Sequence, residues 1–85
     1  MKNIQKLKDK KVEIVIFTRS GCMFCSNIID LFDKNSVKYI NYSLDKDFTR
    51  QKFQKMFGKN ATFPRVVING KLIGGHDDTI KLLSE

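Results

Sequence analysis

Two cysteines three positions apart, Cys22 and Cys25, are the residues of this chain whose type and spacing are best suited to chemistry. They follow an apolar run at residues 12–17 and open a stretch, residues 23–32, whose apolar side chains recur at helical spacing. A thiol at a helix start faces unpaired backbone N–H groups and the positive end of the helix dipole, which favour the thiolate. Arg19 adds a nearby positive charge. We therefore expect the pKa of the Cys22 thiol to fall from about 8.5 to roughly 3.5–7.5, which would make it a nucleophile at neutral pH.

The length and composition indicate one small folded domain. The chain has 85 residues, of which 41% are hydrophobic, and seven are Phe. No apolar run approaches the ~20 residues of a membrane span, and the first six residues lack the apolar middle of a secretory signal. We expect a cytoplasmic protein with no membrane partner. Two cysteines are also fewer than the disulfide framework of a small secreted domain usually contains.

The strong positive charge raises the question of a nucleic-acid partner. Sixteen Lys and Arg against nine acidic residues give a net charge of +7. Basic residues are spread along the chain, apart from a cluster formed by Lys2, Lys6, Lys8, Lys10 and Lys11. The interleaved Arg and aromatic residues of a base-stacking surface are missing, so no nucleic-acid partner is expected. We predict a basic, solvated N-terminal lead at residues 1–11, helical with Ile4 and Leu7 on one side, and a domain at residues 12–85.

The elements that must position the cysteines alternate in type. The β-branched run at residues 12–17 predicts a central parallel strand covered on both faces. A helix is expected from Cys22 to about Asn35, and a second strand at residues 37–42. The predicted order continues with a helix, two strands and a final helix.

The second half of the chain contains clear boundary signals. Asp45 and Asp47 are expected to start the second helix, which Gly58 closes. Its predicted core stripe consists of Phe48, Phe53, Met56 and Phe57. Asn69-Gly70 predicts a type I′ turn between strands at residues 65–68 and 71–73. A short helix with Ile80, Leu82 and Leu83 follows. The complete order is β-α-β-α-β-β-α, an α/β fold with a four-stranded mixed sheet.

This order, with Cys-Met-Phe-Cys at the first strand-to-helix junction, resembles the thioredoxin fold and, more narrowly, dithiol glutaredoxins. The resemblance covers residues 12–84. Its motifs occur in the right sequence order: Thr18-Arg19, the cysteine motif at residues 22–25, Thr62-Phe63-Pro64, and the Gly-Gly-His-Asp-Asp segment at residues 74–78. The chain departs from the family in having Met23-Phe24 between the cysteines, where many members have Pro-Tyr. A monomeric state is expected.

The resemblance implies a glutathione-dependent thiol–disulfide oxidoreductase. In that scheme Cys22 attacks the mixed disulfide and Cys25 resolves protein disulfides. The implied partners are glutathione and glutathionylated or disulfide-containing proteins, with ribonucleotide reductase as a candidate. Two alternatives stay open: a thioredoxin-like electron donor reduced by a flavoprotein reductase, and an iron–sulfur cluster carrier. No resident metal is expected, because Cys22, Cys25 and His76 supply at most three ligands and structural zinc needs four.

The resemblance also implies a glutathione site, built from residues near the cysteines and from two segments of the second half of the chain. A cis Phe63–Pro64 bond would leave the Phe63 backbone free to pair with an extended thiol peptide, whereas the alternative is a trans proline starting an edge strand. Backbone N–H groups near Asp77 would take the α-carboxylate of glutathione, and Asp78 its amino group; the alternative is a turn with an acidic N-cap. Arg19 would attract the glycyl carboxylate, helped by one of Arg50, Gln54 and Lys55. The expected binding residues are Arg19, Phe24, Thr62, Phe63, Pro64, Gly75, Asp77 and Asp78.

Overall fold

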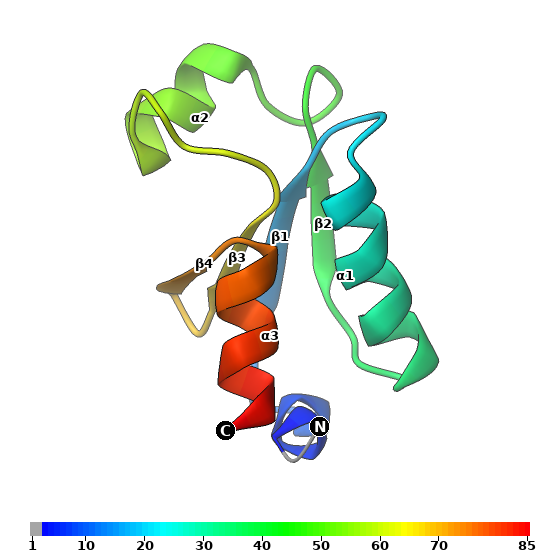
Figure 1. Ribbon diagram of the computed structural model, residues 1–85. Helices are drawn as coiled ribbons and strands as arrows, with labels where there is room; N and C mark the ends of the chain where they lie inside the picture. The colour runs from blue at the N-terminus through cyan, green and yellow to red at the C-terminus, as the bar shows by residue number, and fades with distance from the viewer. Residues whose placement is uncertain (1–2) are drawn as a thin grey trace.

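The computed structural model describes residues 3–85, and its helices and strands follow the predicted order (Figure 1). A 3-10 helix, η1, precedes them. The elements are η1 (Ile4–Lys8), β1 (Ile14–Thr18), α1 (Met23–Lys34), β2 (Ile40–Ser43), α2 (Arg50–Phe57), β3 (Arg65–Ile68), β4 (Lys71–Gly74) and α3 (His76–Ser84). Within residues 3–85, the four-stranded mixed sheet with three α-helices confirms the predicted fold class. None of the helices within residues 3–85 is both long and apolar enough to cross a bilayer.

β1 lies inside the sheet, whose strand order is β2-β1-β3-β4. It runs parallel to β2 and antiparallel to β3, while β3 and β4 form an antiparallel hairpin. A parallel pair needs a crossover connection, which α1 supplies. Asn69 and Gly70 connect the hairpin with φ angles of 52° and 78°, which confirms the predicted turn.

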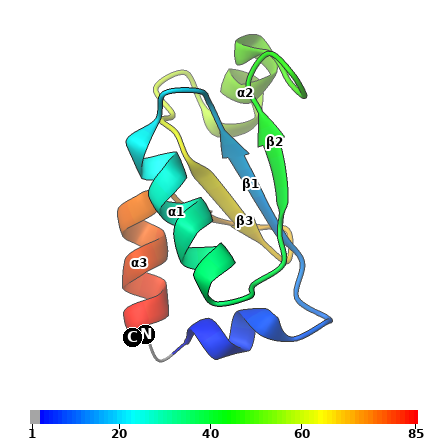
Figure 2. The same cartoon turned by 90° about the vertical axis from the view of Figure 1, so that its right-hand side faces the viewer.

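The two faces of the sheet are covered differently. α1 and α3 lie side by side against one face, and α2 lies at the end where β1 stops (Figures 1 and 2). Ile14, Ile16 and Thr18 of β1 are buried on the first face. Val15 and Phe17 on the other face are only half-buried. The prediction that the strand is covered on both faces therefore holds for the first face and only in part for the second.

The main core combines the sheet, α1, α3 and the N-terminal lead. It contains Ile14, Ile16, Ile28, Phe32, Val37, Val66 and Leu83, together with Ile4 and Leu7 of η1. The backbone N–H of Asn3 donates to Leu83 O at 3.1 Å, and its side-chain amide donates to Leu82 O at 3.0 Å. These contacts join η1 to the end of α3. The lysines of the predicted solvated lead are exposed at positions 6, 8, 10 and 11, and Lys2 lies outside the described residues.

A second, aromatic cluster attaches α2 to the sheet. Phe53 is 1% exposed and its ring stacks on Phe63 with centroids 4.1 Å apart. Phe17 of β1 contacts Phe48 and Phe57 at 5.4 and 5.0 Å. The predicted aromatic stripe is therefore largely core. The exception is Met56 of the stripe, which is 54% exposed and was wrongly predicted to be core, because the helix turns it away from this cluster.

α2 begins later than its acidic residues suggested. Thr49 is its N-cap, and its hydroxyl accepts the Lys52 backbone N–H at 3.2 Å. Asp45 and Asp47 belong instead to the preceding turn, where the Asp47 carboxylate accepts the Ser43 N–H at 2.8 Å. Asp and Thr both satisfy free backbone donors, so the composition alone could not distinguish a turn from a helix cap.

The connection from α1 to β2 shortens the second predicted strand. Ser36 has a φ of 59°, and the Val37 N–H donates to Phe32 O at 2.9 Å, so the chain folds back before β2 begins at Ile40. Tyr39 in this connection donates its hydroxyl to Asp33 Oδ1 at 2.8 Å. Burial, followed by this hydrogen bond and the nearby carboxylates, raises the pKa of Tyr39 to about 12.

Candidate active site

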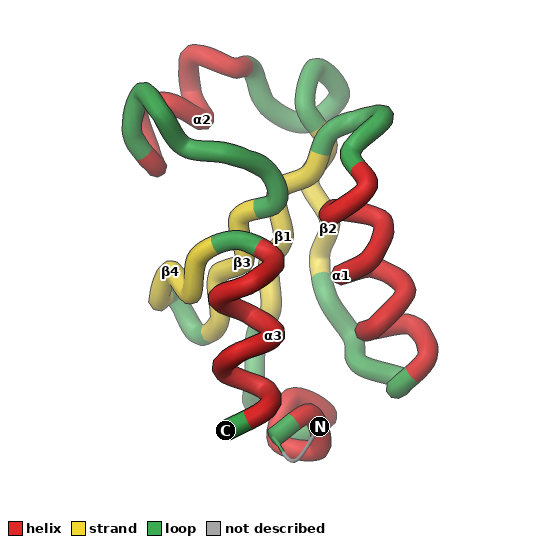
Figure 3. The backbone as a smooth tube through the Cα atoms, viewed as in Figure 1, coloured by secondary structure: helices red, strands yellow, loops and turns green. Residues whose placement is uncertain are grey.

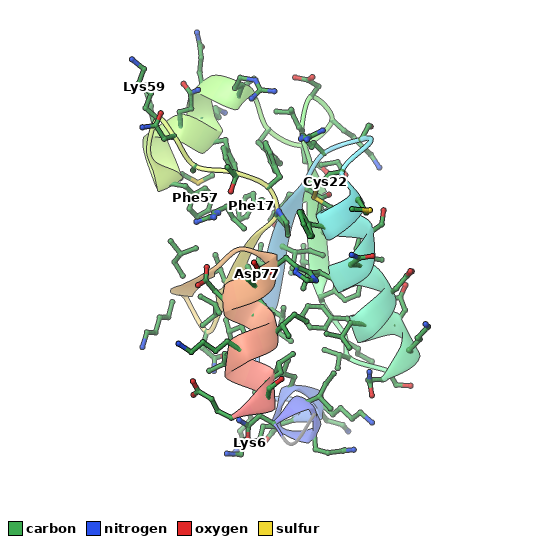
Figure 4. All side chains as sticks on the ribbon, viewed as in Figure 1. Lys6, Phe17, Cys22, Phe57, Lys59 and Asp77 are labelled. Atoms are coloured by element: carbon green, nitrogen blue, oxygen red, sulfur yellow. A yellow bond between two sulfur atoms is a disulfide. The ribbon has the colours of Figure 1, made fainter. Side chains whose placement is uncertain are left out.

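Cys22 and Cys25 form a disulfide at the start of α1, with Cα atoms 5.2 Å apart (Figure 4). Cys22 is the N-cap residue, in extended conformation, and Cys25 lies in the first helical turn. The Cys25 backbone N–H donates to Cys22 Sγ at 3.2 Å. This sulfur thus occupies the place that a Ser or Asp oxygen takes in an ordinary N-cap, where a free backbone donor favours negative charge.

Both cysteines are buried in this oxidised form. Cys22 is 7% exposed and Cys25 is 2% exposed, so the sulfur expected to act as the nucleophile is largely covered while the disulfide is intact. The disulfide holds the Cys22 sulfur against the first turn of α1, over the buried Cys25. Of the two cysteines, Cys22 keeps the larger exposed fraction.

The loop between α2 and β3 passes close to the start of α3 (Figure 3). Its Phe63–Pro64 peptide bond is cis, as the resemblance implied, and Pro64 is buried. The alternative of a trans proline on an edge strand is wrong, because Pro64 precedes β3, which pairs with strands on both sides. This loop and the start of α3 form two walls of a pocket.

The pocket has a volume of about 220 Å³ and contains most of the predicted binding residues. Its lining consists of Phe24, Thr62, Phe63, Arg65, Gly75, His76, Asp77 and Asp78. Phe24 lies between the two cysteines in sequence, so the pocket adjoins the disulfide. Pro64 is buried and does not line the pocket. Arg19 does not line the pocket; it is exposed, and its Nη1 donates to Ser20 O at 3.2 Å.

Arg65 is a pocket residue that sequence reasoning missed. Its Nε donates to Thr62 O at 2.9 Å, and its Nη2 donates to Thr62 Oγ1 at 3.4 Å. A side-chain carbon added at Gly75 would lie 3.3 Å from Arg65 Nη2. The guanidinium therefore reaches from the cis-proline loop to the start of α3. The available signal was its place directly after the Thr62-Phe63-Pro64 motif.

His76, which was not among the predicted binding residues, lines the pocket. Its ring lies against Phe24 with centroids 5.0 Å apart. Its Nδ1 is 2.9 Å from Asp77 Oδ1, a contact that becomes an ion pair when the imidazole is protonated. Phe24 and Asp77 thus contact the His76 ring at the start of α3. Within residues 3–85 no three His, Cys, Asp or Glu side chains are grouped to hold a metal ion.

The two glycines before α3 allow the close approach of a side chain from α3 itself. Gly75 is the N-cap, and its N–H donates to Asp78 Oδ2 at 3.1 Å. Gly74 has a φ of 130°, and a side-chain carbon there would overlap the Asp78 carboxylate. The predicted acidic N-cap is therefore wrong in position: Asp78 caps from the third helical residue, and the backbone of Gly75 takes the N-cap place.

The three residues weighed as helpers of Arg19 lie away from this pocket. Gln54 and Lys55 line a separate hollow on α2, and Arg50 is exposed at the start of that helix. The pocket's own charges come from Arg65, Asp77 and Asp78, with His76 beside them. This mixture suits a small ligand that carries both an amino group and carboxylates.

Comparison with known proteins identifies relatives of this site. The family model described as Glutaredoxin matches residues 14–73. Glutaredoxin-C6 of Oryza sativa subsp. japonica is 33% identical over 75 residues, covering 85% of this chain and 67% of the relative. Mitochondrial glutaredoxin-2 of Mus musculus is 37% identical over 76 residues, covering 85% of this chain and 48% of the relative. The chain thus spans about half the length of this mammalian relative.

Solved structures agree with the sequence comparison. A crystal structure of wheat glutaredoxin is 32% identical and superposes with a TM-score of 0.73, covering 96% of this chain and 82% of that one. The buckwheat glutaredoxin–glutathione complex is 28% identical with a TM-score of 0.69, covering 94% of this chain and 74% of that one.

Proposed function

Because this chain belongs to the glutaredoxin family, we propose that it is a thiol–disulfide oxidoreductase that uses glutathione as its reductant. The observation that carries the proposal is the Cys22–Cys25 disulfide at the start of α1, beside a pocket lined by Phe24. The buckwheat relative, whose structure is a glutathione complex, supports the choice of reductant.

In the proposed reaction Cys22 is the nucleophile. Its thiolate attacks the glutathione sulfur of a mixed disulfide, and the substrate thiolate leaves and takes up a proton. Cys22 then carries glutathione through a new disulfide bond. A second glutathione thiolate exchanges with that bond, which releases glutathione disulfide and restores the Cys22 thiolate. The Cys25 N–H, 3.2 Å from the sulfur, stabilises the thiolate at the start and end of the cycle.

For a protein disulfide, Cys25 supplies the second step. Attack by Cys22 breaks the substrate disulfide and forms a mixed disulfide between Cys22 and one cysteine of the substrate protein. The Cys25 thiolate attacks Cys22 Sγ, the reduced substrate leaves, and the Cys22–Cys25 disulfide forms. That disulfide is the state of the present structure.

The pocket is proposed to bind glutathione along the loop and the start of α3. The Asp78 carboxylate, already held by the Gly75 N–H, faces the amino group of the γ-glutamyl end. Arg65 lines the pocket beside Gly75, so it is placed to attract the α-carboxylate of that same end, and Arg19 as the partner of the glycyl carboxylate stays a prediction. Phe63 offers its backbone to the peptide portion. Cytoplasmic location, a monomeric state and ribonucleotide reductase as substrate stay predictions.

Substitution of each cysteine tests the assignment. Cys22→Ser should abolish reduction of both a glutathionylated peptide and a protein disulfide, since it removes the nucleophile. Cys25→Ser should keep reduction of the glutathionylated peptide and lose most reduction of the protein disulfide. The measurement is NADPH consumption in an assay coupled to glutathione and glutathione reductase, with Ser20→Ala as the control.

Three results would contradict this scheme. Activity retained in Cys22→Ser would remove the assigned nucleophile. Reduction of the oxidised protein by a thioredoxin reductase but not by glutathione would favour the electron-donor alternative. A glutathione-dependent visible absorbance after anaerobic purification, without turnover, would favour the iron–sulfur alternative.

A further inference from the structure

The positive charge of this molecule gathers at two opposite ends. Residues 48–65 contain five cations and no acidic residue. Residues 1–11 contain five lysines and one acidic residue. The remaining stretches are nearly balanced, with six cations and eight acids. α2 and the N-terminal lead lie far apart in Figure 1, along a molecule measuring 35 × 23 × 22 Å. The charge that looks dispersed in sequence therefore forms two separate surfaces.

The α2 surface, which we define as Arg50, Gln51, Lys52, Gln54, Lys55 and Lys59, is free to meet a partner. Its four cations are exposed. In the part of the chain from residue 3 to 85, the only ion pair joins His76 and Asp77, so none of these four is neutralised. Gln51, Gln54, Lys55 and Lys59 line an open hollow of about 520 Å³. Amide and ammonium donors in a shallow hollow suit an extended, negatively charged segment.

This surface is connected to the redox pair. α2 and Cys22 lie at the same end of the sheet (Figure 4). Phe53 anchors α2 by stacking on Phe63 with a 16° interplanar angle. Phe63 in turn lines the pocket beside the disulfide. A polypeptide with its cysteine at the disulfide would therefore extend over the cis-proline loop toward the α2 cations.

From these observations we propose that the α2 surface docks an acidic segment of the protein whose glutathionylated or disulfide-bonded cysteine is reduced. The inference rests on the proposed function and adds the class of protein substrate. A nucleic acid is the less suitable occupant, because base stacking needs exposed aromatic rings and the rings of α2 are buried or half-buried. The lead at the other end carries similar charge but lies away from Cys22.

The test uses peptides with one glutathionylated cysteine, identical except that the flanking residues are Asp in one and Asn in the other. In the glutathione-coupled assay, the wild-type protein should reduce the Asp peptide with a kcat/KM roughly tenfold higher at about 0.01 M salt. The preference should disappear at about 1 M salt, where the Debye length falls to about 3 Å. The Asn peptide reports activity without the proposed docking.

A pair of charge-matched variants separates docking from net charge. Lys52→Glu with Lys59→Glu alters the α2 surface, whereas Lys8→Glu with Lys10→Glu makes the same change in charge on the exposed lead. The first variant should lose or reverse the preference for the Asp peptide, and the second should keep it. Both should reduce the Asn peptide at the wild-type rate. Lys52→Gln with Lys59→Gln is the milder variant if the reversed charges impair folding.

Different failures have different meanings. Equal rates on both peptides would overturn the docking inference alone, as would equal loss of preference in the two Glu variants. No turnover of either peptide by the wild-type protein would overturn the proposed function and, with it, this inference. Binding of a single-stranded oligonucleotide that only the α2 variant loses, without any peptide preference, would overturn the inference in favour of a nucleic-acid partner.

Discussion

At the scale of single residues, backbone donors and glycines organise the site more than pairs of charges do. The Cys22 sulfur accepts the Cys25 N–H, and the Asp78 carboxylate accepts the Gly75 N–H. Each bond satisfies a donor that a helix start would leave unpaired. The starts of α1 and α3 thus fix the Cys22 sulfur and the Asp78 carboxylate, while Thr62, Phe63 and Arg65 reach the pocket from the cis-proline loop and the start of β3.

Gly74 provides a sharp test of this arrangement. Gly74→Ala should destabilise the protein by roughly 2–3 kcal/mol, because alanine disfavours a φ of 130° and its methyl group would displace Asp78. Gly70→Ala is the control: its φ is also positive, at 78°, but no atom lies near the added carbon. It should cost only about 1–2 kcal/mol.

Urea unfolding of both variants measures the difference. The excess cost of Gly74→Ala over Gly70→Ala reports the contact with Asp78 together with the larger backbone penalty of a φ of 130°. Gly74→Ala should also raise KM for the glutathionylated substrate, since the Asp78 carboxylate must move. Equal losses of stability would show that the close approach at Gly74 has no energetic consequence.

At the scale of elements, contacts between aromatic rings attach α2 to β1 and to the cis-proline loop. Phe53 is buried among Phe48, Phe57 and Phe63, outside the main core. We therefore expect that α2 can loosen with little effect on the pairing of the strands, and that Phe63 would lose its stacking partner at the same time. The position of the cis-proline loop depends on this small cluster.

Phe53→Ala should weaken α2 selectively. Truncating a buried Phe costs about 3–5 kcal/mol, whereas Met56→Ala, at a 54% exposed position on the same helix, should change stability by about 0.5 kcal/mol or less. Hydrogen exchange should show lost protection in α2 and in the loop before β3, with β1 less affected. Phe53→Leu serves if the alanine variant does not fold. Comparable protection of α2 in the Phe53 and Met56 variants would contradict this role.

At the scale of the whole molecule, the N-terminal lead closes the end of the core opposite α2. Ile4 and Leu7 are 4% and 8% exposed and join the main cluster, and Asn3 hydrogen-bonds to the end of α3. The lysines beside them remain in solvent. The lead therefore contributes apolar packing to the fold and positive charge to one end of the surface.

Leu7→Ala measures that contribution and tests the predicted domain start at residue 12. Leu→Ala at a buried position costs about 2–5 kcal/mol, so the free energy of unfolding should fall by an amount in that range. Lys8→Ala, at the exposed neighbouring position, should change it by about 0.5 kcal/mol or less. Thermal and urea unfolding give both values. A negligible loss in Leu7→Ala would indicate that residues 12–85 fold without the lead.

Features that depend on neighbouring residues could be predicted from the sequence alone. The order of strands and helices follows from hydrophobic periodicity, and the hairpin from Asn69-Gly70, whose positive φ angles few other pairs adopt readily. The helix start at Cys22 could be predicted because the apolar residues, which are nearly continuous in β1, recur at helical spacing after it. Six of the eight predicted binding residues line one pocket, because each belongs to a local motif that the family resemblance locates.

Only the tertiary structure decided which separate segments meet. It brought Arg65 and His76 into the pocket and left Arg19 outside, and it buried Cys22 against the first turn of α1. It also turned Met56 to solvent and gathered the α2 cations at the end of the molecule that contains the disulfide. These outcomes depend on how helices and loops pack against the sheet, and a local sequence pattern contains no information about distances between residues far apart in the chain.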